Sequence, residues 1–258
     1  MTGLHIEFSG PETGIPLVLL HGFGGDGSAW DPVKAGLPES IRVMAVDLPG
    51  HGKSLDADGR GGAGRMAKAI LAGLDAAGVE SFHLAGHSMG GAVSALMAMR
   101  APERVKSLTL VAPGGMARDI NAGLLARYAK ATTEAEIRRC LDDMSAPGFV
   151  TSQAVVDHFT AVRAKPGVIE ALDETYQAMF PNGADEGQGV LPADALIALA
   201  MPVFMIWGTA DAVLPCPKPS ALPASFAFSV LPELGHMLPE ESPDAIIRVL
   251  GAALTNDS

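Results

Sequence analysis

The 258-residue chain has little cysteine, few aromatic residues and no long hydrophobic segment. Its two cysteines, Cys140 and Cys216, belong to no Cys-x-x-Cys or Cys/His pattern, which favours two free thiols in a reducing compartment. The longest apolar run, residues 195–207, is interrupted by Pro202 and is shorter than the roughly 20 residues of a membrane helix. The N-terminal residues lack a basic region followed by an apolar stretch. The expectation is a soluble, cytoplasmic protein.

Positive charge is also scarce, with 18 Lys and Arg against 29 Asp and Glu and a net charge of −11. An acidic chain without a basic cluster repels phosphate backbones and anionic lipids, so nucleic acid and membrane partners are not expected. A mean hydropathy of +0.26, with 48% hydrophobic residues, instead predicts a folded globular protein. A small-molecule substrate is the expected partner, and the oligomeric state stays open.

Short apolar runs alternate with helical patterns in the N-terminal part. Strands are predicted at residues 4–8, 16–20, 43–46, 82–85, 108–111, 203–207 and 226–230, and helices at 28–37, 66–77, 89–100 and 244–254. Apolar runs without alternation are typical of parallel strands that are covered on both faces. The sequence therefore predicts an α/β fold with a mostly parallel sheet of about seven or eight strands flanked by helices.

The alternation stops between residues 114 and 198, where apolar residues recur at helical spacing. This block predicts an inserted helical cap, or lid, over a core formed by residues 1–113 and 199–258. Its apolar faces supply six candidate substrate-pocket residues, Leu124, Leu125, Tyr128, Phe159, Met179 and Phe180. The glycine-rich stretch 59–64 is interpreted as a mobile loop rather than as a binding element.

The strongest chemical signal is Gly86-His87-Ser88-Met89-Gly90, a G-x-S-x-G motif between a predicted strand and a predicted helix. A serine hydroxyl is a poor nucleophile unless it is held exposed beside a base. A tight strand-to-helix turn with small neighbours holds it in that way. Ser88 is therefore the candidate nucleophile.

A base and an acid follow later strands. Asp211 comes directly after the strand predicted at 203–207, and His236 follows the last predicted strand. Loops at the carboxyl ends of parallel strands meet at one edge of a sheet, so these side chains can reach Ser88. Three such residues, each after its own strand and in the order Ser, Asp, His, indicate a catalytic triad.

An acyl-transfer serine also needs hydrogen-bond donors for the oxyanion. The stretch His21-Gly22-Phe23-Gly24-Gly25 follows a predicted strand and can present backbone N–H groups at the same edge. The backbone N–H groups of Phe23 and Met89 are the predicted pair. Loss of one such donor typically costs about 3–4 kcal/mol of transition-state stabilisation.

These motifs, together with residues 47–54, resemble those of α/β-hydrolases of the esterase type along nearly the whole chain. The resemblance implies the α/β-hydrolase fold, with Ser88 as nucleophile, Asp211 as acid, His236 as base, and Phe23 and Met89 as oxyanion donors. Residues 113–121 and the helices after them also resemble the hydrolase-like acyltransferase domain of acetoin dehydrogenase complexes. The N-terminal lipoyl domain usual in those subunits is not expected here.

A dinucleotide-binding oxidoreductase is a rival interpretation, because Gly22, Gly24 and Gly27 fit G-x-G-x-x-G after a strand. Asp47, at the end of the next predicted strand, would then bind a ribose hydroxyl. This interpretation leaves Ser88, Asp211 and His236 unexplained. No metal-ligand pattern occurs, and no cofactor is implied.

The sequence thus predicts a serine hydrolase that acts on a carboxylic ester with a small to medium, uncharged acyl group through an acyl-enzyme. Three variants use the same triad: carbon–carbon bond hydrolysis, acyl transfer to a thiol, and a perhydrolase side activity. The natural substrate is left open.

Overall fold

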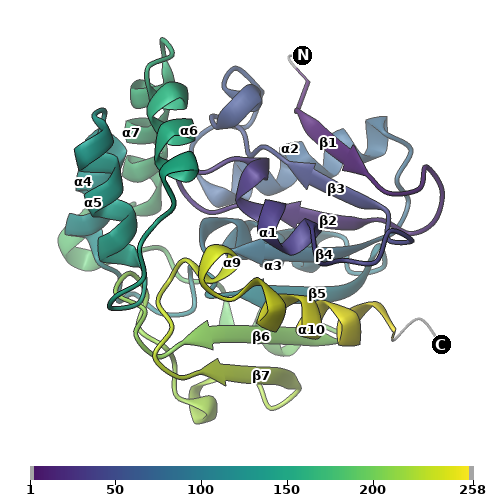
Figure 1. The fold of residues 1–258 in the computed structure, drawn as a ribbon. Coiled ribbons are helices and arrows are strands. Elements are labelled where there is room, and N and C mark those ends of the chain that lie inside the picture. The colour runs from purple at the N-terminus through teal and green to yellow at the C-terminus, as the bar shows by residue number, and fades with distance from the viewer. Residues whose placement is uncertain (1–2, 256–258) are drawn as a thin grey trace.

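A seven-stranded sheet runs through the computed structural model, which describes residues 3–255 (Figure 1). Its strands are β1 (Ile6–Ser9), β2 (Leu17–Leu20), β3 (Val43–Val46), β4 (Phe82–His87), β5 (Val105–Val111), β6 (Val203–Gly208) and β7 (Phe226–Leu231). They lie in the order β1-β3-β2-β4-β5-β6-β7. Only β1 is antiparallel to its neighbour, so the predicted mostly parallel sheet is confirmed.

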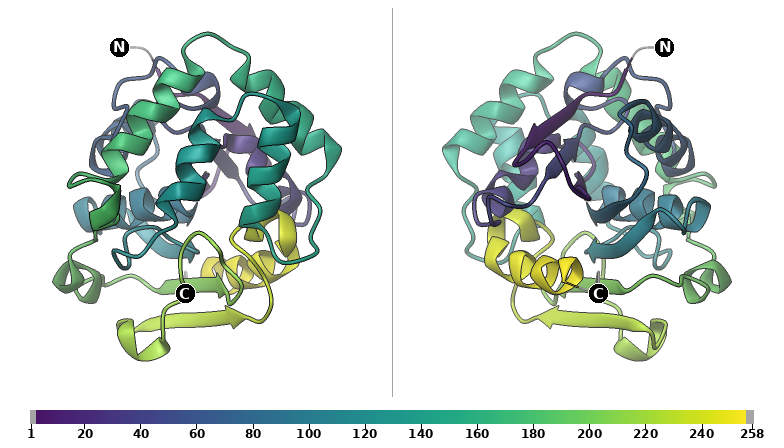
Figure 2. Two further views of the ribbon diagram at one scale, coloured as in Figure 1. Left: turned by 90° about the vertical axis from the view of Figure 1, so that its left-hand side faces the viewer. Right: turned by 90° about the vertical axis from the view of Figure 1, so that its right-hand side faces the viewer.

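Helices cover both faces of this sheet, as Figures 1 and 2 show. On one face lie α2 (Ala63–Ala76) and α3 (Met89–Arg100), with α8 (Ala193–Ile197) against α3. On the other lie α1 (Asp31–Lys34), α9 (Leu238–Glu241) and α10 (Pro243–Leu254). The helix predicted over 28–37 is wrong as one element. A 3₁₀ turn (Gly27–Trp30) precedes α1, because Pro32 lacks an N–H and is tolerated only in a first helical turn.

Four further helices lie between β5 and β6 in the sequence, in the block predicted to be helical. They are α4 (Ala122–Lys130), α5 (Glu134–Met144), α6 (Gln153–Arg163) and α7 (Val168–Met179). Asn121, Thr133 and Ser152 cap the first three through side-chain bonds to backbone N–H groups. Figure 1 shows these inserted helices at the edge to which the arrows of β6 and β7 point, which is where the strand-end loops meet. The domain ranges stay a prediction, and residues 1–2 and 256–258 lie outside the described residues.

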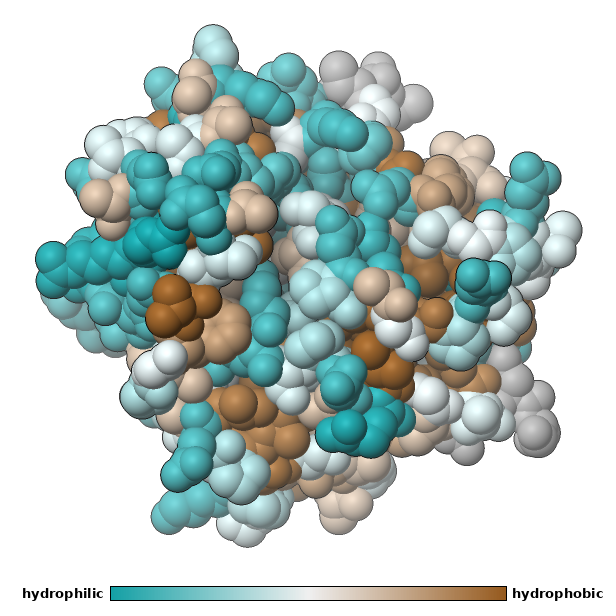
Figure 3. All heavy atoms as spheres, viewed as in Figure 1, coloured by the Kyte–Doolittle hydropathy of each residue, from teal (hydrophilic) through white to brown (hydrophobic). Residues whose placement is uncertain are grey.

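The core lies between the sheet and its helices, where Trp30, Phe82 and Trp207 are almost fully buried. Cys140 and Cys216 are both free, as predicted. Figure 3 shows apolar residues dispersed among hydrophilic ones on the face of Figure 1. Within residues 3–255, every helix is too short or too polar to traverse a bilayer.

Candidate active site

Ser88 lies at the sharp turn between β4 and α3. Its backbone has φ 54° and ψ −119°, a region that residues other than glycine rarely adopt and that costs about 1–3 kcal/mol. Four backbone hydrogen bonds hold this geometry, one of them from the Ala92 N–H to the Ser88 carbonyl at 3.2 Å. The Ser88 N–H donates to the Val111 carbonyl at 2.9 Å, and the Ser88 carbonyl accepts from the N–H groups of Gly91 and Gly114, both at 2.9 Å. The end of β5 therefore holds the strained serine in place.

Glycine is required beside this turn because backbones approach closely there. A Cβ at Gly86 would lie 2.3 Å from the Gly90 carbonyl oxygen. A Cβ at Gly90 would lie 2.4 Å from the carbonyl oxygens of both Leu20 and His21, at the end of β2. These contacts bring the loop after β2 against the start of α3, and so fix the distance between that loop and Ser88.

Replacing Gly90 by alanine is expected to lower the free energy of unfolding by about 2–4 kcal/mol, because the new methyl group would overlap two backbone oxygens. Urea denaturation of the variant and the wild type measures the difference. Gly251→Ala in α10 is the control, since that helical position is exposed and a Cβ there meets nothing within 4 Å. It should stabilise by about 0.5–1 kcal/mol. Equal stability of Gly90→Ala and wild type would contradict the packing described here.

Ser88, His236 and Asp211 lie in hydrogen-bonding contact. His236 Nε2 is 2.9 Å from Ser88 Oγ, and His236 Nδ1 is 2.8 Å from Asp211 Oδ2. The three side chains follow β4, β7 and β6, whose carboxyl ends share one edge of the sheet. The imidazole can accept a proton from the hydroxyl, while the carboxylate holds the opposite ring nitrogen in its protonated form.

The Asp211 carboxylate is held in one orientation by four hydrogen bonds. Oδ1 accepts from the backbone N–H groups of Val213 at 2.8 Å and Leu214 at 2.7 Å. Oδ2 accepts from the Trp207 indole N–H at 3.1 Å, in addition to His236. Burial alone would raise the pKa of Asp211, but the His236 ring and the two backbone N–H groups outweigh it and lower that pKa. The carboxylate is therefore ionised and aimed at His236.

Glu241 and His87 fix the backbone around His236. Glu241 accepts from the N–H of Gly235 at 2.8 Å and from the N–H of Met237 at 2.9 Å. His87 Nε2 donates to the His236 carbonyl at 2.8 Å. Burial, reinforced by the neighbouring His236, lowers the pKa of His87 to about 3, so the His87 ring is neutral. Sequence reasoning missed the bracing by Glu241, whose only signal was a carboxylate five residues after His236.

The loop after β2 carries the first predicted oxyanion donor. His21 orders this loop, since its Nδ1–H donates to the Gly22 carbonyl at 2.7 Å and its Nε2 accepts from the Leu48 N–H at 2.9 Å. Within residues 3–255, the N–H groups of Phe23 and Met89 donate no hydrogen bond. Both residues line the same cavity as Ser88. Two unused donors thus stand near the hydroxyl, and their catalytic role stays a prediction.

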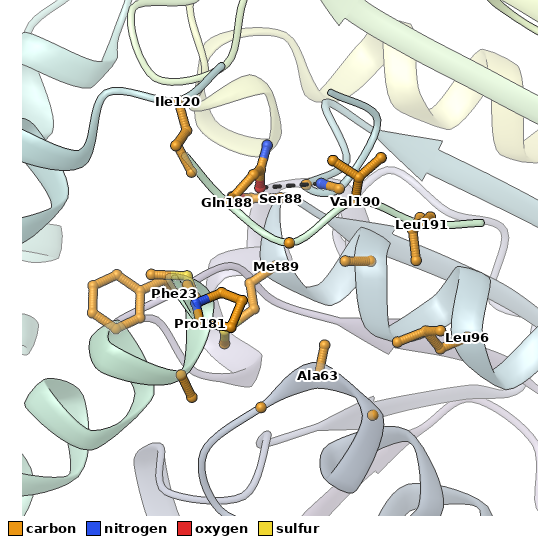
Figure 4. Close-up of a pocket in the computed structure, with 18 of the residues that line it drawn as sticks. Phe23, Ala63, Ser88, Met89, Leu96, Ile120, Pro181, Gln188, Val190 and Leu191 are labelled. Carbon is orange, nitrogen blue, oxygen red and sulfur yellow. Dashed lines mark hydrogen bonds between the residues drawn. The ribbon is translucent and has the colours of Figure 1, made fainter. Parts of the chain in front are cut away.

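A cavity of about 340 Å³ opens from Ser88 between the sheet side and the inserted helices. Figure 4 shows side chains that line this cavity, among them Met89 and Leu96 from α3, together with Ala63, Ile120 and Pro181. Ser88 and Gln188 are the only polar side chains among its lining residues, and none of these is charged. The Gln188 amide is already used, since it accepts from the Gly115 N–H at 3.1 Å and donates to the Ala117 carbonyl at 2.9 Å.

The six predicted pocket residues divide into three groups. Leu125 and Met179 line the main cavity. Leu125 also lines a small cavity of about 30 Å³ beside Ser88 and His236, together with Tyr128 and Phe159.

Leu124 and Phe180, the other two predicted pocket residues, line neither of these cavities. Leu124 is 2% exposed within the helix packing, and Phe180 packs on Tyr176 with 4.8 Å between ring centroids. Residues 61–64 and 188–191 do line the main cavity, although 59–64 was interpreted as a loop without a binding role. The small residues of 61–64 were the only signal for the first segment, and 188–191 carried none.

The geometry does not favour the dinucleotide interpretation. Asp47 Oδ1 accepts from the Gly27 N–H at 2.8 Å, and Oδ2 accepts from the Lys53 N–H at 2.8 Å. With both oxygens bonded to backbone, this 5%-exposed carboxylate braces the loops and is not presented to a ribose. Among residues 3–255, no three His, Cys, Asp or Glu side chains lie together in a way that could hold a metal ion.

Comparison with known proteins gives concordant matches. Residues 15–243 match the family model described as alpha/beta hydrolase fold. The chain is 37% identical over 238 residues to a dihydrolipoyllysine-residue acetyltransferase component of an acetoin cleaving system from Pseudomonas putida, covering 92% of this chain but only 62% of that relative. It is 31% identical over 219 residues to 2-hydroxymuconate semialdehyde hydrolase from Pseudomonas sp. strain CF600, covering 83% of this chain and 76% of that enzyme. The structure of carboxylesterase CesB (YbfK) from Bacillus subtilis superposes with a TM-score of 0.82 at 22% identity, covering 99% and 88% of the two chains.

Proposed function

Because the chain belongs to the alpha/beta hydrolase fold family of enzymes, we propose that it is a serine hydrolase that cleaves a carboxylic ester with a small to medium, uncharged acyl group. The observation that carries the proposal is the hydrogen-bonded series Ser88–His236–Asp211, whose serine lines a cavity without charged side chains. An ester carbonyl above Ser88 would meet a nucleophile, a base and two free N–H donors together.

In the proposed reaction, Ser88 Oγ attacks the ester carbonyl while His236 Nε2 accepts the hydroxyl proton. The N–H groups of Phe23 and Met89 stabilise the oxyanion. When the carbon–oxygen bond of the ester breaks, His236 returns the proton to the leaving alcohol, and the acyl group stays on Ser88. A water molecule, deprotonated by His236, then attacks the acyl-enzyme and releases the carboxylic acid.

The main cavity is the proposed acyl site. It follows α3 from Ser88 past Ala92 to Leu96, and a helix rises 1.5 Å per residue. Ala92 therefore lies about 6 Å, and Leu96 about 12 Å, along the helix from Ser88. The apolar lining favours an aliphatic chain, and a carboxylate would lose its hydration there without gaining a partner.

Changing the length of this cavity should change acyl-chain preference. Ala92→Leu is expected to lower kcat/KM for p-nitrophenyl hexanoate about tenfold relative to p-nitrophenyl acetate, since about two methylenes of the chain lose their site at roughly 0.8 kcal/mol each. Leu96→Ala should shift the preference towards longer chains. A panel of p-nitrophenyl esters from acetate to dodecanoate, with a succinate ester as the charged member, measures both shifts. A wild-type preference for the succinate or dodecanoate ester would contradict the proposed substrate class.

The activities for which two relatives are named are alternative outcomes of the same panel. One relative is named for acetyl transfer to a dihydrolipoyllysine residue, and another for hydrolysis of 2-hydroxymuconate semialdehyde. Dihydrolipoamide as acceptor and this semialdehyde as substrate therefore belong in the panel. If the reaction with either compound is faster than the hydrolysis of every ester, the proposed reaction changes from ester hydrolysis to that reaction. The proposed role of Ser88 stays the same.

A further inference from the structure

A second set of cavities lies on the His236 side of Ser88. The small cavity of about 30 Å³ is lined by Ser88, His236, Met237 and Glu240. Met237 and Glu240 also line a cavity of about 180 Å³ that α5, the loop before α6 and α9 enclose. His236 does not line the main cavity. Ser88 thus stands between an acyl-sized cavity on one side and a chain of two smaller cavities on the other.

The direction of proton transfer indicates which cavity receives the leaving alcohol and which receives the acyl group. His236 Nε2 must give its proton to the oxygen of the leaving alcohol, so that oxygen has to lie beside His236. The rest of the alcohol then points towards Met237 and Glu240. The main cavity, lined by Phe23 and Met89, is left for the acyl group.

Glu240 is the one acidic side chain among the described residues that line this leaving-group path, and its carboxyl is only partly satisfied. Its Oε2 atom is buried without a hydrogen bond, and the carboxyl interacts with its own backbone N–H but has no hydrogen bond or ion pair with another described residue. Leaving a buried polar group unpaired costs about 1–3 kcal/mol. The adjacent Glu241 differs, because both of its oxygens accept backbone N–H groups. Glu241 therefore has a structural role here, and Glu240 does not.

The surroundings of Glu240 define the group that would satisfy it. Burial, with the nearby charge of Glu241, raises the pKa of Glu240 to about 8, so the carboxyl keeps its proton at neutral pH. A neutral carboxylic acid both donates and accepts a hydrogen bond, as an alcohol hydroxyl does. The cavity beyond is lined mainly by apolar side chains such as Leu141, Phe149 and Val155, which suit the carbon chain of a small alcohol.

We propose that Glu240 determines leaving-group specificity by hydrogen bonding to a second hydroxyl on the departing alcohol, so that the preferred substrates are monoesters of short diols or polyols. This inference rests on the proposed function. It adds a polar recognition site on the leaving-group side of Ser88, opposite a main cavity that no charged side chain lines.

The matched substrates for the test are 2-hydroxyethyl butanoate and propyl butanoate, which have the same acyl group and leaving groups of equal length. Wild type should prefer the hydroxyethyl ester in kcat/KM. In Glu240→Met that preference should fall about three- to tenfold, because the hydrogen bond is lost, and in Glu240→Gln most of it should remain. Glu39→Met, which makes the same side-chain replacement at an exposed position, is the control and should keep the wild-type ratio. Thermal unfolding should find Glu240→Met no less stable than wild type, because a buried carboxyl oxygen without a hydrogen bond is removed.

Two failures can be told apart. If both esters are hydrolysed but the ratio is the same in wild type, Glu240→Met and Glu240→Gln, the assignment of Glu240 is wrong and the serine hydrolase proposal stands. If wild type hydrolyses neither ester and forms no adduct with a fluorophosphonate, the proposed function fails, and the inference about Glu240 fails with it.

Discussion

Ser88→Ala is expected to reduce kcat/KM for p-nitrophenyl butanoate by about 10⁴-fold or more, because the acyl-enzyme can no longer form and only binding and the oxyanion donors remain. The substitution removes one oxygen that points into a cavity, and the four backbone hydrogen bonds of residue 88 do not depend on it. The fold should persist, so the loss is a loss of chemistry. Steady-state rates at several enzyme concentrations measure it.

Ser94→Ala is the matched control for this substitution. Ser94 lies on the same helix, is fully buried, and its Oγ has no hydrogen-bond partner among the described residues. Its loss should change kcat/KM less than about threefold, because Ser94 packs behind the turn against Gly86 and lines neither cavity beside Ser88. If Ser88→Ala retained a tenth of the wild-type rate, the nucleophile would have to be another group.

Asp211→Asn is expected to lower kcat about 10⁴-fold near neutral pH with little change in stability. The reason lies in the four hydrogen bonds of this carboxylate. Because Oδ1 accepts hydrogen bonds from two backbone N–H groups, the amide oxygen of asparagine must occupy the position of Oδ1. The amide NH₂ then faces His236 Nδ1 and forces the ring proton onto Nε2, the nitrogen that has to accept the proton of Ser88.

Two measurements accompany the Asp211→Asn rate. The residual rate should rise with pH above 8, because hydroxide replaces the disabled base. Asp185→Asn, at an exposed position, serves as the control and should match wild type. A rate for Asp211→Asn within tenfold of wild type would show that this carboxylate does not set the tautomer of His236.

Much of the fold was predictable because strand and helix periodicity agree with the chain order. The strand predicted at 43–46 has the same bounds as the observed β3, and the helix predicted at 89–100 has the same bounds as α3. Strand β5 begins at Val105, before the predicted residue 108, because Lys106 and the buried Ser107 interrupt the apolar run. Boundaries shift where a polar side chain is accommodated by a neighbouring strand, and sequence alone does not show that neighbour.

The candidate site was predictable only in part, for a physical reason. Ser88, Asp211 and His236 each follow a strand, so parallel topology brings them to one edge. Periodicity identifies Leu124 and Leu125 equally as buried, but only the structure shows that Leu125 faces the cavities and Leu124 faces its helical neighbours. The unpaired Oε2 atom of Glu240 was equally hidden, since the sequence alone gives no measure of side-chain burial in a loop and short helix.

The measurement that tests the central claim most directly is the intact mass of the protein after treatment with a fluorophosphonate. Such reagents modify a serine that a neighbouring base activates, as the 2.9 Å contact between Ser88 and His236 implies. A single stoichiometric adduct on wild type, absent from Ser88→Ala, is the predicted result. No adduct on folded wild type, or an undiminished adduct on Ser88→Ala, would contradict the assignment of Ser88 as an activated nucleophile.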